Sequence, residues 1–221
     1  LLRTEGSEVF LSFEIIVPDG QRLSSYQVSP NAEYILYSFT SNDFVSTSWL
    51  VEVNTGNRTQ IPDHIGNEAR WHPDITAIAL ITDNRTQLTL YDVATNEISQ
   101  LFSAYDDSLT LYEIRWMRWS PNGQYLLYSD EYTNHYGEQT LRLYLHDFES
   151  NTRSIVEDNL QVHHLDFRWV STTEFVYTIA ETALEPNGSY QTDFVFRDAI
   201  TLDILYRTRT EESELLDCGF G

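Results

Sequence analysis

The feature that most constrains the fold is a motif that recurs along the chain. The four copies begin at positions 27, 70, 118 and 168, so the intervals are 43, 48 and 50 residues. Three copies start with an Arg-Trp pair, and the first is weaker. The copies are Gln27–Asn31, Arg70–Asp74, Arg118–Gly123 and Arg168–Thr172. A repeat of 40–50 residues is typical of radial or solenoid architectures, in which each unit buries its apolar face against the next.

Each copy of the motif is followed by the same order of short apolar segments. The segment after the motif is rich in Val, Ile, Leu, Tyr and Phe, as in 34–39, 75–81, 124–128 and 174–179. A second segment follows, at 49–53, 88–93, 143–148 and 194–199, and then a turn and a last short segment. Such runs between Gly, Pro, Asn and Asp predict strands and turns, and no stretch keeps a helical period. The sequence therefore predicts an all-β fold, a β-propeller of four-stranded antiparallel blades.

The blade repeats cover about 26–61, 69–101, 116–156 and 166–206 in a single propeller domain, 1–221. Phe10–Val17 and Arg22–Tyr26 read as the two outer strands of a fifth blade. Residues 1–25 and 207–221 would then share the closing blade, with inner strands at Leu1–Thr4 and Glu214–Cys218. Five blades of about 44 residues account for the length, which favours a closed five-bladed ring. The alternative is a fragment of a six- to eight-bladed ring.

Composition excludes several classes of protein. The formal net charge of −21 argues against a nucleic-acid partner, because a phosphate backbone would be repelled over most of the surface. No apolar run approaches the length of a membrane span, so membrane insertion is not expected. The one cysteine, Cys218, excludes an intrachain disulfide and a thiolate metal cluster. All thirteen basic residues are Arg, and we attribute the absence of Lys to lineage composition.

The third copy of the motif, Trp119–Asp130, resembles the tryptophan–Ser-Pro-Asp-Gly repeat of TolB-like propellers and tryptophan–aspartate-repeat-like propellers. It is also similar to the propeller domains of dipeptidyl-peptidase-type serine peptidases. The resemblance implies the fold over residues 26–206. It implies no activity, because those proteins include periplasmic scaffolds, peptidase gating domains and uncharacterised secreted proteins. The copies depart from the pattern at Val28, Ile75 and Val170–Thr172.

Arg70, Arg118 and Arg168 occupy the same position of three repeats, so they should lie at one height near the central channel. They form either an anion site or structural ion pairs with the acids that end the next strands, Asp83, Asp130 and Glu181. We favour the ion pairs. The repeating acids Glu52, Asp92, Asp147 and Asp198 should cap the turns that follow them.

Features that do not repeat are better candidates for binding. Two insertions, 131–138 and 181–192, fall in the same loop of successive blades and should project from one face. Tyrosine is common in binding surfaces because it offers a large, rigid contact area. The candidate binding residues of this loop face are Glu131, Tyr132, His135, Tyr136, Glu138, Asn187 and Tyr190.

No catalytic motif is present, and we name no catalytic residue and no metal ligand. His163-His164 would point to opposite faces of a strand, and no cofactor is expected, although a loose calcium site remains open. The chain is therefore expected to be a non-catalytic interaction or scaffold propeller that docks a protein partner through its loop face. It would be periplasmic or secreted. The alternative is a ligand-binding or glycan-active propeller that uses acids at the channel mouth.

Overall fold

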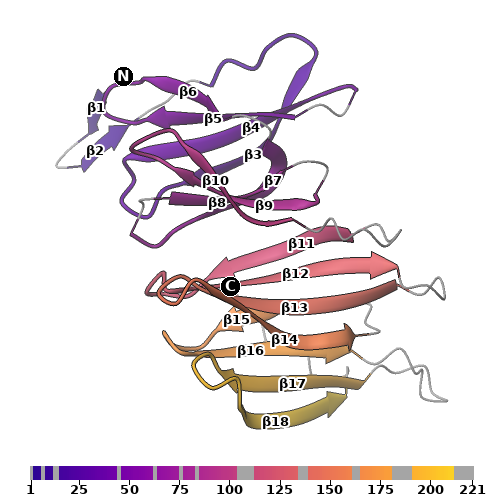
Figure 1. The fold of residues 1–221 in the computed structure, drawn as a ribbon. Helices are drawn as coiled ribbons and strands as arrows, with labels where there is room; N and C mark the ends of the chain where they lie inside the picture. Colours follow the sequence, from indigo (N-terminus) through magenta and orange to yellow (C-terminus); the bar gives the residue numbers. More distant parts are fainter. Residues whose placement is uncertain are drawn as a thin grey trace.

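The computed structural model describes residues 2–5, 8–11, 15–43, 46–61, 64–74, 77–82, 85–103, 112–133, 139–160, 165–180 and 191–211. These residues form strands and turns, and none of them lies in a helix that could cross a membrane. The prediction of an all-β propeller fold is confirmed, because the described chain is organised as four antiparallel sheets of four strands each (Figure 1).

The four sheets follow the order of the chain, and we call them blades 1 to 4. Blade 1 contains β3 (Gln21–Val28), β4 (Tyr34–Ser41), β5 (Ser46–Glu52) and β6 (Arg58–Ile61). Blade 2 contains β7 (His64–Trp71), β8 (Ala77–Thr82), β9 (Gln87–Asp92) and β10 (Ile98–Ser103). Blade 3 contains β11 (Tyr112–Trp119), β12 (Tyr125–Thr133), β13 (Gln139–Asp147) and β14 (Thr152–Leu160). Blade 4 contains β15 (Phe167–Trp169), β16 (Glu174–Ala180), β17 (Gln191–Asp198) and β18 (Ile204–Glu211).

A separate two-stranded hairpin precedes blade 1 and consists of β1 (Leu2–Glu5) and β2 (Glu8–Leu11). The interpretation of Arg22–Tyr26 as an outer strand of a fifth blade is wrong. These residues lie in β3, the first strand of blade 1, where they pair with β4. The reason is that this strand continues without a break into Gln27 and Val28, so both halves belong to one element. Residues 207–211 likewise extend β18.

Apolar cores lie between consecutive blades. Leu36 and Leu50 of blade 1 pack with Ile78 and Leu80 of blade 2. The next two cores follow the same pattern. Between blades 2 and 3, the core contains Ala79 and Ile81 of blade 2 and Leu126 and Tyr128 of blade 3. Between blades 3 and 4, it contains Leu127 and Leu143 of blade 3 and Phe167 and Phe175 of blade 4. Since β12 lies between two cores, Tyr125–Asp130 is buried on both faces. Alternation along β12 therefore decides which neighbouring blade each side chain meets.

The blades contact one another in sequence order, 1 with 2, 2 with 3 and 3 with 4. Among the described strands no comparable contact joins blade 4 to blade 1, and Figure 1 shows these two blades at opposite ends of the molecule. Residues 212–221, which include the predicted strand Glu214–Cys218, lie outside the described residues. The closing fifth blade therefore stays a prediction.

The turns between the third and fourth strands repeat in detail. In each of them one residue has a positive φ: Gly56, Asn96, Asn151 and Leu202, at 73°, 59°, 51° and 62°. The prediction that repeating acids cap these turns is confirmed. Asp92 accepts from the amides of Ala94 and Thr95, and Asp198 from those of Ile200 and Thr201. In the other two turns, Glu52 accepts a hydrogen bond from the Thr55 hydroxyl group, and Asp147 accepts one from the Ser150 hydroxyl group.

Candidate functional site

The three repeated arginines lie on the first strands of blades 2, 3 and 4. Arg70, Arg118 and Arg168 pair across the sheet with Ala79, Leu127 and Val176, the equivalent residues of the second strands. They therefore share one position in three blades, as the spacing predicts. These first strands are edge strands, so one side of each has no neighbour within its own sheet.

Hydrogen bonds link this position to the neighbouring blades in both directions. The Trp119 indole Nε1 donates to the backbone oxygen of Arg70 at 3.1 Å, and Trp169 Nε1 donates to that of Arg118 at 3.2 Å. In the other direction, Arg118 Nε donates to the Phe167 oxygen at 3.1 Å, and Gln27 Nε2 donates to the Ala69 oxygen at 2.9 Å. Sequence reasoning missed these links, although the recurring Arg-Trp pair was their signal.

The expected ion pair between Arg118 and Asp130 is wrong. Arg118 lies opposite Leu127, which packs against blade 4, and its guanidinium reaches a backbone oxygen of that blade. Asp130 lies three residues further along β12 and therefore faces blade 2. Arg168 pairs instead with Asp166, at 3.4 Å, and Arg70 Nη1 donates to the Ala69 oxygen. The other two acids, Asp83 and Glu181, lie outside the described residues.

The predicted loop face begins where β12 and β16 end. Glu131 Oε2 lies 2.9 Å from Nε of Arg115. The Tyr132 ring is buried, and the guanidinium of Arg142 lies 4.1 Å from its centre. The end of β12 and the start of β13 lie at the same edge of blade 3 as the end of β16 and the start of β17 do in blade 4 (Figure 1). Five candidates lie outside the described residues: His135, Tyr136, Glu138, Asn187 and Tyr190. The binding role of the loop face stays a prediction.

Asp130 is the most unusual acid in the described part of the chain. Its side chain is 1% exposed, and neither carboxylate oxygen has a hydrogen bond of ordinary geometry there. Burial raises the pKa of Asp130 to about 6, and the charge of Arg142 and the hydroxyl group of Tyr144, both on the neighbouring strand, act in the opposite direction. Arg142 itself donates to Asp158 Oδ1 at 2.8 Å and to the Tyr144 hydroxyl at 2.9 Å.

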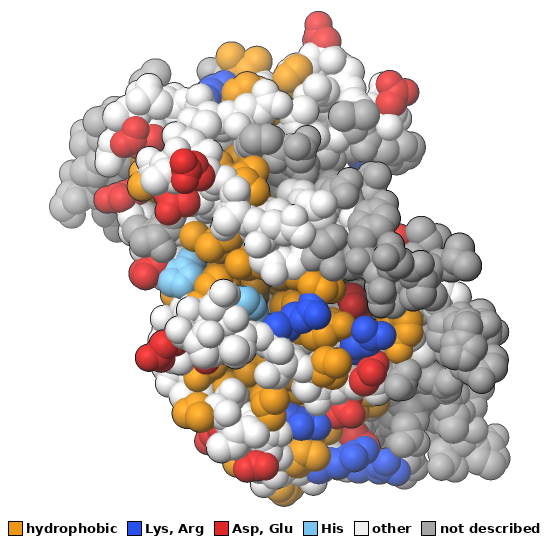
Figure 2. Space-filling view, in the orientation of Figure 1, with side chains coloured by type: hydrophobic (Ala, Val, Ile, Leu, Met, Phe, Trp, Pro, Cys, Tyr) orange, Lys and Arg blue, Asp and Glu red, His pale blue; other side chains and the backbone are white. Residues whose placement is uncertain are grey.

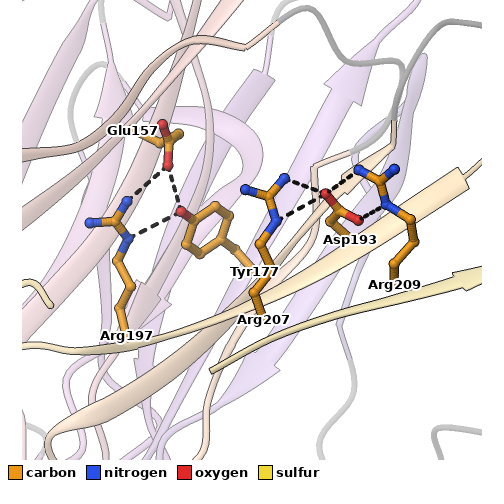
Figure 3. A network of polar contacts seen from close by, with 6 residues as sticks. All are labelled: Glu157, Tyr177, Asp193, Arg197, Arg207 and Arg209. Atoms are coloured by element: carbon orange, nitrogen blue, oxygen red, sulfur yellow. Dashed lines mark hydrogen bonds and ion pairs between the residues drawn. The ribbon is translucent and has the colours of Figure 1, made fainter. Parts of the chain in front are cut away.

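A second polar network lies between blades 3 and 4 (Figure 3). Glu157 Oε2 accepts from the Tyr177 hydroxyl at 2.6 Å and from Arg197 Nη2 at 2.9 Å. The neighbouring Asp193 is 2% exposed and accepts from two guanidinium groups, those of Arg207 and Arg209. These hydrogen bonds, Arg209 first, lower the pKa of Asp193 to about 2.

This network concentrates basic side chains on a strongly acidic protein. Figure 2 shows Arg side chains gathered on one face, over the lower part of the molecule, which Figure 1 colours pink to yellow. Each named carboxylate of the network is hydrogen-bonded to at least one guanidinium: Glu157 links blade 3 to blade 4, and Asp193 links β17 to β18 within blade 4. Among the described residues no group of three or more His, Cys, Asp or Glu is arranged to hold a metal ion.

Comparison with solved structures supports the architecture. TolB from Acinetobacter baumannii matches with a TM-score of 0.57 at 15% identity, over 92% of this chain and 45% of that one. The β-propeller domain of the trilobed protease from Pyrococcus furiosus matches with a TM-score of 0.60 at 16% identity, over 88% of this chain and 58% of that one. Acylaminoacyl peptidase from Pyrococcus horikoshii matches with a TM-score of 0.60 at 15% identity, over 79% of this chain and 31% of that one. The chain thus spans less than two thirds of each of these proteins.

No protein-family model matches the sequence, and no curated protein matches it significantly. At these identities the structural matches show the fold alone. The fold is that of a β-propeller built from four-stranded antiparallel blades. The arrangement of these blades is similar to that of TolB and of the propeller domain of the trilobed protease.

Proposed function

We propose that this chain is a non-catalytic protein-interaction propeller that docks a partner through its loop face, outside the cytoplasm. The observation that carries the proposal is the shared edge at which β12 and β16 end and β13 and β17 begin. The two insertions that do not follow the repeat, 131–138 and 181–192, begin or end at this edge. Loops on a rigid sheet scaffold are where binding residues concentrate.

The arrangement of the polar side chains gives further support. Of the repeating arginines, Arg118 donates to a backbone oxygen of the neighbouring blade and Arg168 pairs with Asp166, and the repeating acids cap turns. These groups are explained by the fold, so function is expected from the segments that do not repeat. The resemblance to TolB-like propellers, which include periplasmic scaffolds, fits an extracytoplasmic interaction module.

A site-specific crosslinking experiment tests the proposal. A photoreactive amino acid would replace His135 or Tyr190 of the predicted loop face, and the exposed turn residues Ala94 or Ile200 at the opposite edge would serve as matched controls. After irradiation in its native source, the protein should form a discrete crosslinked product from positions 135 and 190 only. Glu138→Arg should weaken that product, whereas Glu131 is left unchanged because it pairs with Arg115. Crosslinking only from the control positions, or from none, would contradict the proposal.

A further inference from the structure

Asp130 lies at the base of the predicted loop face. β12 runs from Asp130 directly into the insertion 131–138 and ends at Thr133, at the edge of blade 3 where the loop face begins (Figure 1). Asp130 pairs with Ile114 on one side and with Arg142 on the other, so three strands of blade 3 meet around it. A change of charge at Asp130 therefore occurs next to the segment that we expect to bind a partner.

Arg142 interacts with two carboxylates. It is the residue of β13 directly opposite Asp130, and its positive charge lowers the pKa of Asp130. Its hydrogen bonds go elsewhere, since Nε donates to Asp158 Oδ1 at 2.8 Å and Nη1 donates to the Tyr144 hydroxyl at 2.9 Å. Asp130 is 1% exposed, whereas the side chain of Asp158 is 40% exposed. The guanidinium is thus bound to the more exposed carboxylate while the buried one lies beside it.

The same guanidinium anchors the start of the insertion. The Tyr132 ring is buried, and the guanidinium of Arg142 lies 4.1 Å from the ring centre. The Tyr132 hydroxyl donates to Asp158 Oδ1 at 3.3 Å, the oxygen that also accepts from Arg142. These contacts join the end of β12 to β13 and β14. A cation over an aromatic ring and a charge-assisted hydrogen bond both depend on the position of the guanidinium.

The groups that act on Asp130 come from the neighbouring strands of blade 3. Burial has the largest effect and raises the pKa of Asp130 to about 6. Arg142, Tyr144 and Arg153 lower this pKa, and Asp158 raises it. Asp130 therefore gains its charge as pH rises through about 6.

The other elements packed against Asp130 are β11 and blade 2. The charged residues of β11 next to Ile114 are engaged with each other and with β12, since Arg115 forms ion pairs with Glu113 at 3.1 Å and with Glu131 at 2.9 Å. From blade 2, Phe102 packs on the rings of Tyr128 and Tyr144, and the backbone oxygen of Arg85 accepts from the Ile114 amide at 2.7 Å.

We propose that Asp130 is a proton-controlled switch at the base of the loop face. When Asp130 is protonated, Arg142 stays on Asp158 and over the Tyr132 ring, and the start of the insertion is anchored. When Asp130 is ionised, its buried carboxylate attracts the guanidinium directly opposite, and the anchor on Asp158 and Tyr132 weakens. The inference rests on the proposed function and deepens it, because it makes the order of the loop face depend on pH.

Hydrogen exchange of the purified chain tests the switch without a partner. Amide exchange is followed by NMR at pH 5.0 and pH 7.5, with times scaled to equal chemical exchange rates. At the loop end of blade 3, in 131–133 and 139–141, we expect exchange to be about fivefold faster at pH 7.5, because a hydrogen bond of the anchor weakens. The opposite ends of the same strands, 125–127 and 145–147, are the internal control. The change at the loop end should exceed the change at the control end by this factor.

Three variants identify the groups responsible. Asp130→Asn should keep exchange at the loop end slow at both pH values, because residue 130 no longer ionises. Asp158→Asn should make it fast at both pH values, because the acceptor of the anchor is weakened. Glu149→Gln, in an exposed turn at the opposite edge of blade 3, is the matched control and should retain the pH-dependent step. Circular dichroism melting checks that each variant is folded.

Three results would overturn the proposal. The first is equal exchange at the loop end at both pH values. The second is a step of equal size at both ends of the strands, which would report a loss of global stability. The third is a step that persists in Asp130→Asn or, if that variant does not fold, in Asp158→Asn. All three are measured on the chain alone, so failure of the switch can be told apart from failure of crosslinking at positions 135 and 190.

Discussion

Asp130 is a carboxylate placed where a propeller ordinarily places apolar side chains. It continues the alternation of Leu126 and Tyr128 on β12, and both of these residues belong to the core between blades 2 and 3. A buried carboxylate is costly when it is ionised, and the neighbouring Arg142 and Tyr144 offset only part of the cost for Asp130. Its raised pKa expresses that cost, because the folded protein holds the proton more tightly than the unfolded chain does.

The stability cost of Asp130 should therefore depend on pH. The unfolded pKa is near 3.8 and the folded pKa is about 6, so between these values the folded state binds more protons. Stability then falls as pH rises from about 4 to 6, and the full cost remains above pH 6. Asp130→Asn should stabilise the protein at pH 7 by up to about 2–3 kcal/mol, and this gain should vanish near pH 4. Urea unfolding at both pH values measures it.

Asp193 provides a control, because its pKa is shifted in the opposite direction to that of Asp130. Its pKa is lowered to about 2, so its contribution to stability is present above pH 3.8 and is lost as pH falls towards 2. Asp193→Asn should thus destabilise the protein at pH 7 and have less effect near pH 2. If Asp130→Asn lowers stability at pH 7 as Asp193→Asn does, the burial of Asp130 is compensated and the interpretation fails.

The links between blades show how elements are joined in this fold. Trp119 and Trp169 each donate to the backbone of the preceding blade, whereas the buried Nε1 of Trp71 has no partner among the described residues. Blade 1 has Gln27 where blades 2 to 4 have Arg, and this Gln donates to the Ala69 oxygen. The repeated Trp position thus contributes a hydrogen bond between blades in blades 3 and 4, and an unsatisfied indole donor in blade 2.

Trp119→Phe should therefore cost more stability than Trp71→Phe. Both changes remove similar apolar volume, but only the first removes a hydrogen bond. The difference in unfolding free energy should be about 1 kcal/mol, the usual net value of such a bond. Urea unfolding followed by circular dichroism measures both variants under one condition. Equal losses, or a larger loss for Trp71→Phe, would show that the indole hydrogen bond does not hold the blades together.

Strand order and turn chemistry could be predicted from the sequence because they are local. The repeat placed the Arg-Trp motifs on equivalent strands, and Asp92 and Asp198 cap turns as their position suggested. The face of Asp130 is not evident from its place at the end of an apolar run, and it follows only from the alternation that begins at Leu127. Arg22–Tyr26 belongs to the same strand as Gln27 and Val28, although the repeated motif begins only at Gln27 and so gives no sign of this. The network of Asp193, Arg207 and Arg209 joins two strands and carries no local signal.

Charge acts on the whole molecule. With 34 acidic and 13 basic residues, the folded chain brings many like charges together. Such self-repulsion opposes the compact state and is screened over a length of about 30 Å in 0.01 M salt but about 10 Å in 0.1 M salt. The ion pairs around Glu157 and Asp193 act in the opposite direction, but they are few compared with the excess acids.

The melting temperature should therefore rise when NaCl increases from 0.01 to 0.1 M at pH 7. Each kcal/mol of repulsion that is removed should raise it by about 2–4 °C, the range for a chain of this size. A thermal melt followed by circular dichroism checks this, and sodium perchlorate at matched ionic strength is the control that separates screening from ion-specific effects. A fall in melting temperature in both salts would mean that favourable ion pairs outweigh the repulsion.

The sequential contact between blades has a consequence for the order in which the chain can fold. Each blade packs mainly on the blade before it, and Trp119 and Trp169 donate backward to strands that are already synthesised when they appear. In a linear array of this kind, stability is approximately a sum of unit and nearest-neighbour terms, so folding can propagate from one end. The far side of blade 1 is covered, since Tyr37 and Phe39 pack with Ile15, and this makes the N-terminal end a suitable starting point. A nascent chain could thus add one sheet at a time during translation, with only the most recent sheet exposed.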